Sequence, residues 1–146
     1  AYTFPANRDY VFLINGTLTI RGNIIVPNGS VALFSTSDDI TINRTVGSAT
    51  NTAPRPAGQI QGLYSTDSSF VVDGINTCPT ADKMLNIEGA VVTNAAGLGG
   101  SFINLRDLCA ANLTIPSFTI RERLDFLLNA PLLLMKQNTT FKEDAP

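Results

Sequence analysis

The sequence predicts an all-β fold: a short right-handed parallel β-helix (β-solenoid) of about three coils with an appended C-terminal segment. Three stretches, residues 18–23, 40–45 and 85–90, share an order of apolar residue, polar residue and isoleucine, followed by a turn. Short strands of about three to five residues, separated by Gly, Asn, Pro, Ser and Asp corners, lie between and after them. One coil of such a repeat cannot bury its own apolar face, so neighbouring coils must stack on it.

The first elements follow from the local sequence. Residues 11–20 predict two short strands around the Asn15-Gly16 turn, because Asn-Gly is a strong turn signal. The next elements alternate in the same way, with a turn at 21–23, a strand at 24–26, a turn at 27–30, and strands at 31–34 and 40–42. Gly, Asn, Thr and Val are frequent before residue 120, which disfavours long helices there.

The spacing of the isoleucines predicts how the coils stack. Ile20 and Ile42 lie 22 positions apart, which fits one coil. Ile42 and Ile87 lie 45 positions apart, which fits one coil with two insertions, at 47–58 and around 76–82. Stacking then predicts three walls. The three repeat copies form the first wall, and residues 24–26, 60–64 and 90–94 form the second. Residues 31–34, 69–72 and 101–104 form the third wall. The alternative is a Greek-key sandwich, in which the similarity reflects β composition alone.

The last third of the chain differs in composition. Residues 115–135 are strongly apolar and are interrupted by Pro116 and Pro131. They predict either a strand followed by a short helix that begins at Asp125, or an extended segment along the side or end of the solenoid. Because the open ends of a solenoid expose unpaired backbone groups, we divide the chain into a solenoid body, 1–110, and a capping or subunit-contact segment, 111–146.

The composition excludes several classes of function. The chain has 146 residues, one domain by length, with 44% hydrophobic and 15% charged residues and a net charge of −2. This balance gives no attraction to nucleic acid or to an anionic membrane, and no apolar stretch is long enough to span a bilayer. The sequence has no His, which excludes a Ser–His–Asp triad, a Cys–His pair and an HExxH zinc site.

The two cysteines, Cys78 and Cys109, lie 31 positions apart. Two thiols alone cannot make a four-ligand zinc site, so we predict no metal and interpret them as one disulfide, with two buried free thiols as the alternative. A disulfide indicates an extracellular or cell-surface protein. The opening Ala1-Tyr-Thr-Phe4 has no signal peptide and is typical of a processed N-terminus.

Asparagine sequons predict attached glycans. Five Asn-x-Ser/Thr sequons occur, at Asn15, Asn28, Asn43, Asn112 and Asn138, and Asn76-Thr-Cys78 is a rarer variant. Several fall on predicted corners, where a glycan meets no packing obstacle. The alternative is that Asn, Gly, Ser and Thr are there because they make good turns.

The acidic residues define an enzymatic alternative. Two carboxylates from the set Asp38, Asp39, Asp67 and Asp73, with Arg44 or Arg55 as partner, are the groups that a polysaccharide lyase or glycosidase would use. Adjacent Asp38 and Asp39 point to opposite faces of a strand, so acceptance of backbone N–H groups at a corner is the simpler interpretation. We therefore predict no catalytic residues and no cofactor.

Two further motifs have structural interpretations. The Gly97-Leu-Gly-Gly100 run lacks the lysine and helix of a phosphate loop, and we interpret it as a flexible turn. The Arg121-Glu-Arg-Leu-Asp125 motif predicts a salt-bridged edge or, alternatively, a clamp between subunits.

Several motifs resemble those of a group of uncharacterised secreted β-helical surface proteins from candidate-phyla-radiation (Patescibacteria) bacteria. The resemblance is carried by residues 10–20, 31–35, 61–67, 85–89 and 102–108, and by the endings Asp125-Phe-Leu-Leu-Asn-Ala-Pro131 and Glu143-Asp-Ala-Pro146. The chain departs from that group at Leu124, where Pro is usual, and at 139–141, which replace an aromatic-rich stretch. The resemblance implies an extracytoplasmic β-helical surface protein with its natural C-terminus and no assigned enzyme activity.

The preferred function is structural: a subunit of a bacterial extracellular surface filament or appendage that self-assembles head to tail through terminal strand exchange. Stacked coils with open ends extend by adding another stack, and the ends 1–12 and 115–135 are suited to lending a strand. The predicted contact residues are apolar: Phe4, Phe12, Phe126, Leu128 and Leu132. The alternatives are a monomeric carbohydrate-binding or adhesive module and, less favoured, a polysaccharide-active enzyme.

Overall fold

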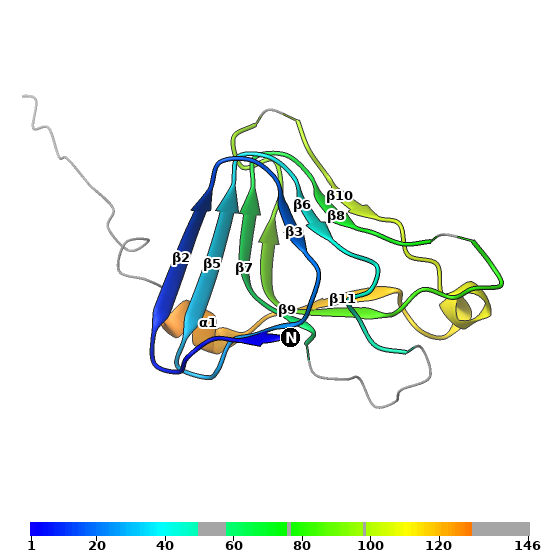
Figure 1. Ribbon diagram of the computed structural model, residues 1–146, viewed down its shortest axis with the longest axis horizontal. Helices are drawn as coiled ribbons and strands as arrows, with labels where there is room; N and C mark the ends of the chain where they lie inside the picture. The colour runs from blue at the N-terminus through cyan, green and yellow to red at the C-terminus, as the bar shows by residue number, and fades with distance from the viewer. Residues whose placement is uncertain (50–57, 76, 98, 130–146) are drawn as a thin grey trace, which may run out of the picture.

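The computed structural model describes residues 1–49, 58–75, 77–97 and 99–129, and these form an all-β chain with parallel sheets (Figure 1). The strands are β1 (Tyr2–Thr3), β2 (Asp9–Ile14), β3 (Leu18–Ile20), β4 (Ile24–Ile25), β5 (Val31–Thr36), β6 (Ile40–Ile42), β7 (Ile60–Thr66), β8 (Phe70–Val72), β9 (Leu85–Val92), β10 (Phe102–Asn104) and β11 (Phe118–Arg121). A 3₁₀ helix, η1 (Cys109–Leu113), and one short α-helix, α1 (Leu124–Leu128), follow β10 and β11.

The larger sheet has two arms. Strand β7 is long enough to pair with β4 at its start, through Ile24 and Ile60, and with β5 along its end, through Leu33 and Leu63. The first arm therefore contains β1, β4, the beginnings of β7 and β9, and β11. The second arm contains β2, β5 and the ends of β7 and β9. A smaller sheet of four strands has the order β10-β8-β6-β3.

The chain passes through these three faces in a repeated order, first arm, second arm and smaller sheet, which we call a round. The first round is β1, β2 and β3, the second β4, β5 and β6, the third β7 and β8, and the fourth β9 and β10. Strand β11 then returns to the first arm beside β9. Figure 1 shows β2, β5, β7 and β9 side by side from left to right, with β3, β6, β8 and β10 to their right.

Paired glycines bend the larger sheet between its arms. Gly62 and Gly89 are partners in the β7–β9 ladder and have φ of +147° and +140°. A Cβ on Gly89 would lie 1.8 Å from the carbonyl oxygen of Gly62, so a side chain does not fit there. The corner is visible in Figure 1 where β7 and β9 turn.

Aromatic rings stack through the interior between rounds. Phe34 stacks on Phe12 at 4.8 Å between ring centroids and on Tyr64 at 5.2 Å, with the rings within 10° of parallel. In the smaller sheet, Phe70 stacks on Phe102 at 5.4 Å. Parallel register places like residues over one another, because successive side chains on a strand alternate between the two faces.

The predicted stacking of residues 22 positions apart is confirmed, since Ile20 pairs with Ile42 in the parallel β3–β6 ladder. The third copy of the repeat was placed wrongly. Ile42 pairs with Val72, whereas Ile87 lies in the larger sheet between Ile60 and Ile120. The apolar–polar–Ile pattern indicates which side chains of a strand point to the interior. It does not indicate which of the two sheets the strand joins.

The predicted second and third walls are correct in part. Ile24 pairs with Ile60 in the first arm, but Ala90 pairs with Leu63, so residues 90–92 lie past the bend, in the second arm. Residues 69–72 and 101–104 adjoin in the smaller sheet, whereas 31–34 belong to the larger sheet beside β7. The antiparallel sandwich is wrong for the described residues, whose named strands all pair in parallel.

The segment after the body is a strand followed by a short helix, the first of the two predicted alternatives. Helix α1 begins at Leu124, next to the predicted start at Asp125. Strand β11 continues the larger sheet of the body through its pairing with β9. The division at residue 110 stays a prediction, and residues 130–146 lie outside the described part of the chain.

Candidate functional site

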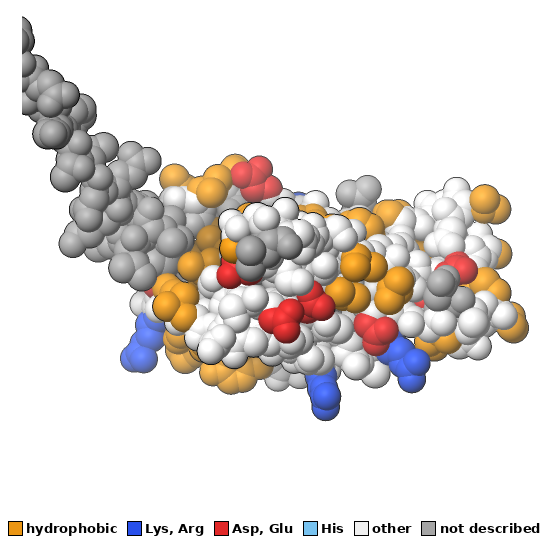
Figure 2. All heavy atoms as spheres, turned by 90° about the horizontal axis from the view of Figure 1, so that it is seen from above, with side chains coloured by type: hydrophobic (Ala, Val, Ile, Leu, Met, Phe, Trp, Pro, Cys, Tyr) orange, Lys and Arg blue, Asp and Glu red, His pale blue; other side chains and the backbone are white. Residues whose placement is uncertain are grey.

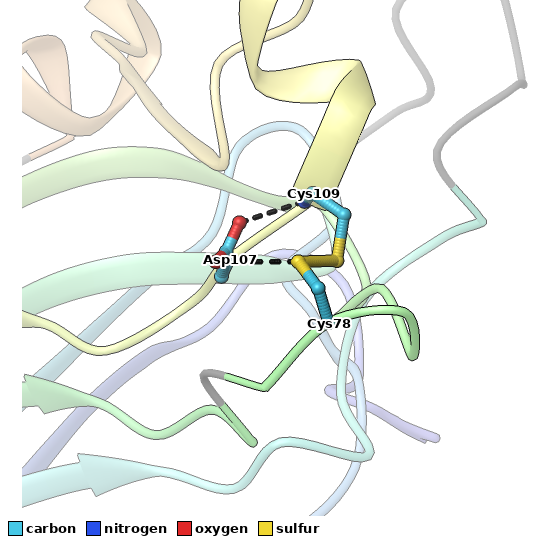
Figure 3. A group of neighbouring side chains, drawn as sticks. All are labelled: Cys78, Asp107 and Cys109. Carbon is cyan, nitrogen blue, oxygen red and sulfur yellow. Dashed lines mark hydrogen bonds between the residues drawn. A yellow bond between two sulfur atoms is a disulfide. The ribbon is translucent and has the colours of Figure 1, made fainter.

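The predicted disulfide is confirmed. Cys78, in the loop after β8, is bonded to Cys109 at the start of η1, with 5.7 Å between their Cα atoms (Figure 3). The Asp107 carboxylate accepts the Cys109 N–H at 2.7 Å and lies 3.6 Å from the Cys78 sulfur. Because the sulfurs are bonded to each other, the Cys78–Asp107–Cys109 cluster does not offer the two thiolates that a soft metal ion prefers.

Arg106 joins several rounds from a buried position that the sequence did not reveal. It is 5% exposed, and its guanidinium donates to the carbonyl oxygens of Asp73 at 3.1 Å, Lys83 at 2.8 Å and Asn43 at 3.2 Å. Burial lowers the pKa of Arg106 to about 10, against the opposing charges of Asp82 and Asp73. The group is therefore still charged at neutral pH and holds loops of different rounds together.

Two of the candidate catalytic carboxylates, Asp38 and Asp39, accept hydrogen bonds from residues at turns. Asp39 accepts the backbone N–H of Ser69 at 2.9 Å, as the simpler interpretation predicted, and Asp38 accepts the hydroxyl of Thr17 at 3.1 Å. Asp67 lines a shallow hollow. Arg55 lies outside the described residues.

This hollow lies between the ends of the second-arm strands and has a volume of about 300 Å³. Its lining is mixed: Leu13, Ile14, Asn15, Ser35, Thr36, Ser37 and Asp67. Figure 2 looks down on the side of the molecule where the second arm passes into the smaller sheet, and shows a mainly uncharged surface with a few acidic groups and hydrophobic side chains on either side.

The sequon asparagines fall on turns but already make contacts. Asn15 accepts from the Ser37 hydroxyl, Asn28 from Arg123, and Asn43 from the backbone and hydroxyl of Thr45. The Asn112 amide nitrogen donates to Asp107. Asn15, Asn28 and Asn112 are exposed, and Asn138 lies outside the described residues. Glycosylation stays a prediction.

The predicted contact residues divide into buried and exposed groups. Phe4 and Phe126 pack inside the chain's own core, so they reach a neighbour only if their segments move. Phe12 is half-buried at the edge of the core, and Leu128 is 81% exposed at the end of α1. Leu132 lies outside the described residues.

The charged motif before α1 pairs within the chain. Arg123 lies over the Phe126 ring at 4.1 Å, donates to the Val26 carbonyl at 2.7 Å and pairs with Asp125. Arg121 pairs with Glu88 of β9. This is the predicted salt-bridged edge, and it anchors α1 to the corner of the larger sheet.

The two ends of the stack are open in the described part of the chain. At one end, β1, β2 and β3 each pair with a strand on one side only. At the other end the same is true of β10, β11 and residues 90–92 of β9, because β11 covers β9 only over its first residues, Leu85 to Glu88. Asp9 is the single charged residue in β1–β3, and 90–92 and β10 have none.

The aromatic stack reaches both ends. Phe12 is half-buried at the β2 end, where its ring centroid lies 5.8 Å from that of Phe4. At the other end, the ring centroids of Phe102 and Phe118 lie 4.9 Å apart, and both rings are also half-buried. Partly covered rings at both ends, beside open strand edges, make these ends the candidate interaction surface.

Comparisons of the chain with protein-family models, with curated proteins and with solved structures found no match. No helix in the described ranges has the length and hydropathy needed to cross a membrane. The two ends and the residues around them are therefore the features of the described chain that bear on its function.

Proposed function

We propose that the two sheets form a short right-handed parallel β-helix and that the chain is a structural subunit of an extracellular surface filament, joined head to tail. The observation that carries this proposal is the match between the ends: each presents open parallel strands in the second arm and in the smaller sheet. Such a heterologous contact does not close on itself and produces a fibre.

The register within the chain supports the match. Phe12, Phe34, Tyr64 and Val91 occupy one column across β2, β5, β7 and β9. A second copy shifted by four rounds continues this column by placing its Phe12 beside Val91.

The same shift continues the smaller sheet. Leu18, Ile40, Phe70 and Phe102 form a column there, and the second copy's Leu18 would lie beside Phe102. The second arm and the smaller sheet thus accept the same neighbour in one movement.

The end strands also lack the features that prevent edge pairing. Natural edge strands are commonly protected by lysines, prolines, bulges or a covering segment. No lysine or proline occurs in β2, β3, β10 or residues 90–92, and β2 runs for 6 residues. An apolar edge of this kind, with no strand paired to it among the described residues, is a template for another strand.

The disulfide supports a location outside the cytosol, since such bonds persist in oxidising compartments. The resemblance of the motifs to surface proteins of Patescibacteria agrees with that location. We propose that glycans, where present, are carried by exposed turn residues such as Asn15 and Asn28. We propose no enzymatic activity, because Asp38 and Asp39 are engaged at turns.

Electron microscopy and light scattering of the purified chain over a range of concentrations test the proposal. Leu18 N–H and the Ile20 carbonyl bond toward β6, so the backbone groups of Thr19 point to the open edge. Thr19→Pro removes an outward N–H without breaking the β3–β6 ladder, and should abolish filaments while leaving the circular dichroism spectrum unchanged. Thr19→Val keeps the N–H and should assemble normally. Dispersed monomers of the unmodified chain at high concentration would contradict the proposal.

The second candidate is a monomeric carbohydrate-binding module, favoured by the hollow of about 300 Å³ with its polar groups from Asn15, Ser37 and Asp67. An exposed aromatic platform is typical of such modules, whereas Tyr2 is the one strongly exposed aromatic residue among the described positions. Binding of the monomer on a glycan array, lost on Asp67→Ala, would favour this candidate.

A further inference from the structure

Strands β1 and β11 compete for one position when two copies stack. Tyr2, Ile24, Ile60, Ile87 and Ile120 form one column through the first arm. Counted over the described residues, this arm therefore has five strands, whereas the second arm and the smaller sheet have four each. A shift of four rounds places the β11 of one copy where the β1 of the next copy lies. Building on the proposed function, we infer that β1 is a removable cover on β4, which a neighbour's β11 replaces on assembly.

A shift of five rounds avoids the conflict but leaves a gap. In that arrangement β1 pairs with the neighbour's β11, and the second arm and smaller sheet each lack one strand. Strands on either side of the gap would then be about 9–10 Å apart, twice the spacing of a hydrogen-bonded pair. The unpaired backbone groups of β2, β3 and β10 would face this gap, which disfavours the arrangement.

The contacts of β1 are few. The strand has 2 residues, both exposed, and Tyr2 is 59% exposed. Its ladder with β4 spans two residue pairs, and bonds from Tyr2 N–H to the Asn23 carbonyl at 2.7 Å and from Phe4 N–H to the Ile25 carbonyl at 2.9 Å lie at its two ends. Phe4 is buried against Tyr10 and Phe12, so it can serve as the fixed point about which the preceding residues leave.

The exchange replaces a short strand by a longer one. β11 has 4 residues and the register of the first arm aligns its Ile120 with Ile24 once Tyr2 is displaced. The same movement pairs residues 90–92 of one copy with β2 of the next, and β10 of one copy with β3 of the next. A copy that keeps β1 in place cannot form these pairs. The ladder gained is therefore longer than the ladder lost.

Intermolecular disulfides distinguish the two arrangements. Ile24→Cys and Ile120→Cys are made in separate chains, which are mixed, assembled and oxidised, because directly paired strands have Cα atoms within disulfide range. A crosslinked dimer on a non-reducing gel is expected from this mixture and not from either variant alone. The matched mixture of Tyr2→Cys with Ile120→Cys should give no crosslinked dimer. A dimer in this mixture would form if β1 stayed in place beside the neighbour's β11.

Deletion of residues 1–3 provides a second measurement that does not depend on new cysteines. Removing the cover should lower the critical concentration at least about threefold and shorten the lag before filaments appear. Slower assembly of the truncated chain, or a dimer from the Tyr2→Cys mixture, would overturn the inference while the filament proposal stands. Absence of assembly in the unmodified chain would overturn both.

Discussion

At the scale of single residues, Arg106 is the most consequential polar side chain. Its three donors satisfy carbonyl groups of Asn43, Asp73 and Lys83, which belong to different rounds. Methionine has a similar length and no donor, so Arg106→Met leaves these carbonyls without that partner. We expect the free energy of unfolding in urea to fall by about 2–4 kcal/mol.

Arg44→Met is the matched control for this substitution. Arg44 is exposed, and its replacement should change the free energy of unfolding by less than about 0.5 kcal/mol. Equal stabilities for the two variants would show that Arg106 does not hold the rounds together.

Glu88 gives the stability of the chain a defined pH dependence. Burial raises the pKa of Glu88, but hydrogen bonds from Arg121, the Gly58 N–H and Gln61 together lower it below its ordinary value of 4.5. A carboxyl with a lowered folded-state pKa stabilises the protein above its unfolded pKa, and that contribution is lost as the pH falls through the folded value.

We therefore expect the free energy of unfolding to fall more steeply below pH 4.5 in the natural chain than in Glu88→Gln. Urea titrations at a series of pH values measure both slopes. The Glu88→Gln variant keeps part of the slope through Asp125, whose pKa is lowered by the hydrogen bond from Arg123. Parallel curves for the two chains would contradict the role of Glu88.

At the scale of elements, the bend of the larger sheet depends on a glycine. Gly89 has φ of +140°, and a Cβ there meets the Gly62 carbonyl oxygen at 1.8 Å. Gly89→Ala should destabilise the fold by about 2–4 kcal/mol through backbone strain and displacement of β7. Gly22→Ala is the control, since its nearest neighbour is the Ala1 nitrogen at 3.7 Å, and it should change stability by no more than about 1 kcal/mol. Thermal and urea unfolding of both variants check the difference.

The disulfide fixes the loop after β8 to η1. It closes a loop over a sequence separation of 31, which corresponds to about 3–4 kcal/mol in the chain-entropy model. The double variant Cys78→Ser, Cys109→Ser should lose about this much stability, as should the natural chain in reductant. A reductant effect on the double variant itself would show that the loss has another cause.

The sequence predicted elements better than their partners. Periodicity located the strand at 40–42 and its 22-residue spacing from 18–20, because both depend on local alternation. It misplaced residues 85–90, since the choice between two sheets depends on the bend at Gly62 and Gly89, and φ above zero is not written in the hydrophobic pattern. Arg106 was missed for a related reason: its acceptors are backbone carbonyls brought together by the rounds, which no side-chain motif records.

At the scale of the whole molecule, interior packing and the ends follow from the same register. In each round, aromatic and aliphatic side chains pack on those of the round before. The end strands β2 and β10 have the same kind of packing surface and an unpaired edge in the described chain. The corner held by Arg123 and α1 differs, because there the chain leaves the sheet after β11. Among the described residues, the strand edges of the second arm and the smaller sheet are thus unpaired at both ends, whereas the proposed assembly brings β1 and β11 to one position in the first arm.

This arrangement predicts assembly that depends little on salt. The strands that would meet contain Asp9 and Arg121 as their charged residues, Arg121 already pairs with Glu88, and the net charge of the chain is −2. Screening between about 20 mM and 500 mM NaCl therefore has few charge pairs to weaken, and the critical concentration should change by less than about threefold. Sedimentation of filaments over this range measures it, and Thr19→Pro should fail to sediment at every salt concentration. A tenfold or larger change would mean that charged side chains away from the strand edges drive association, and the edge-to-edge contact would then be wrong.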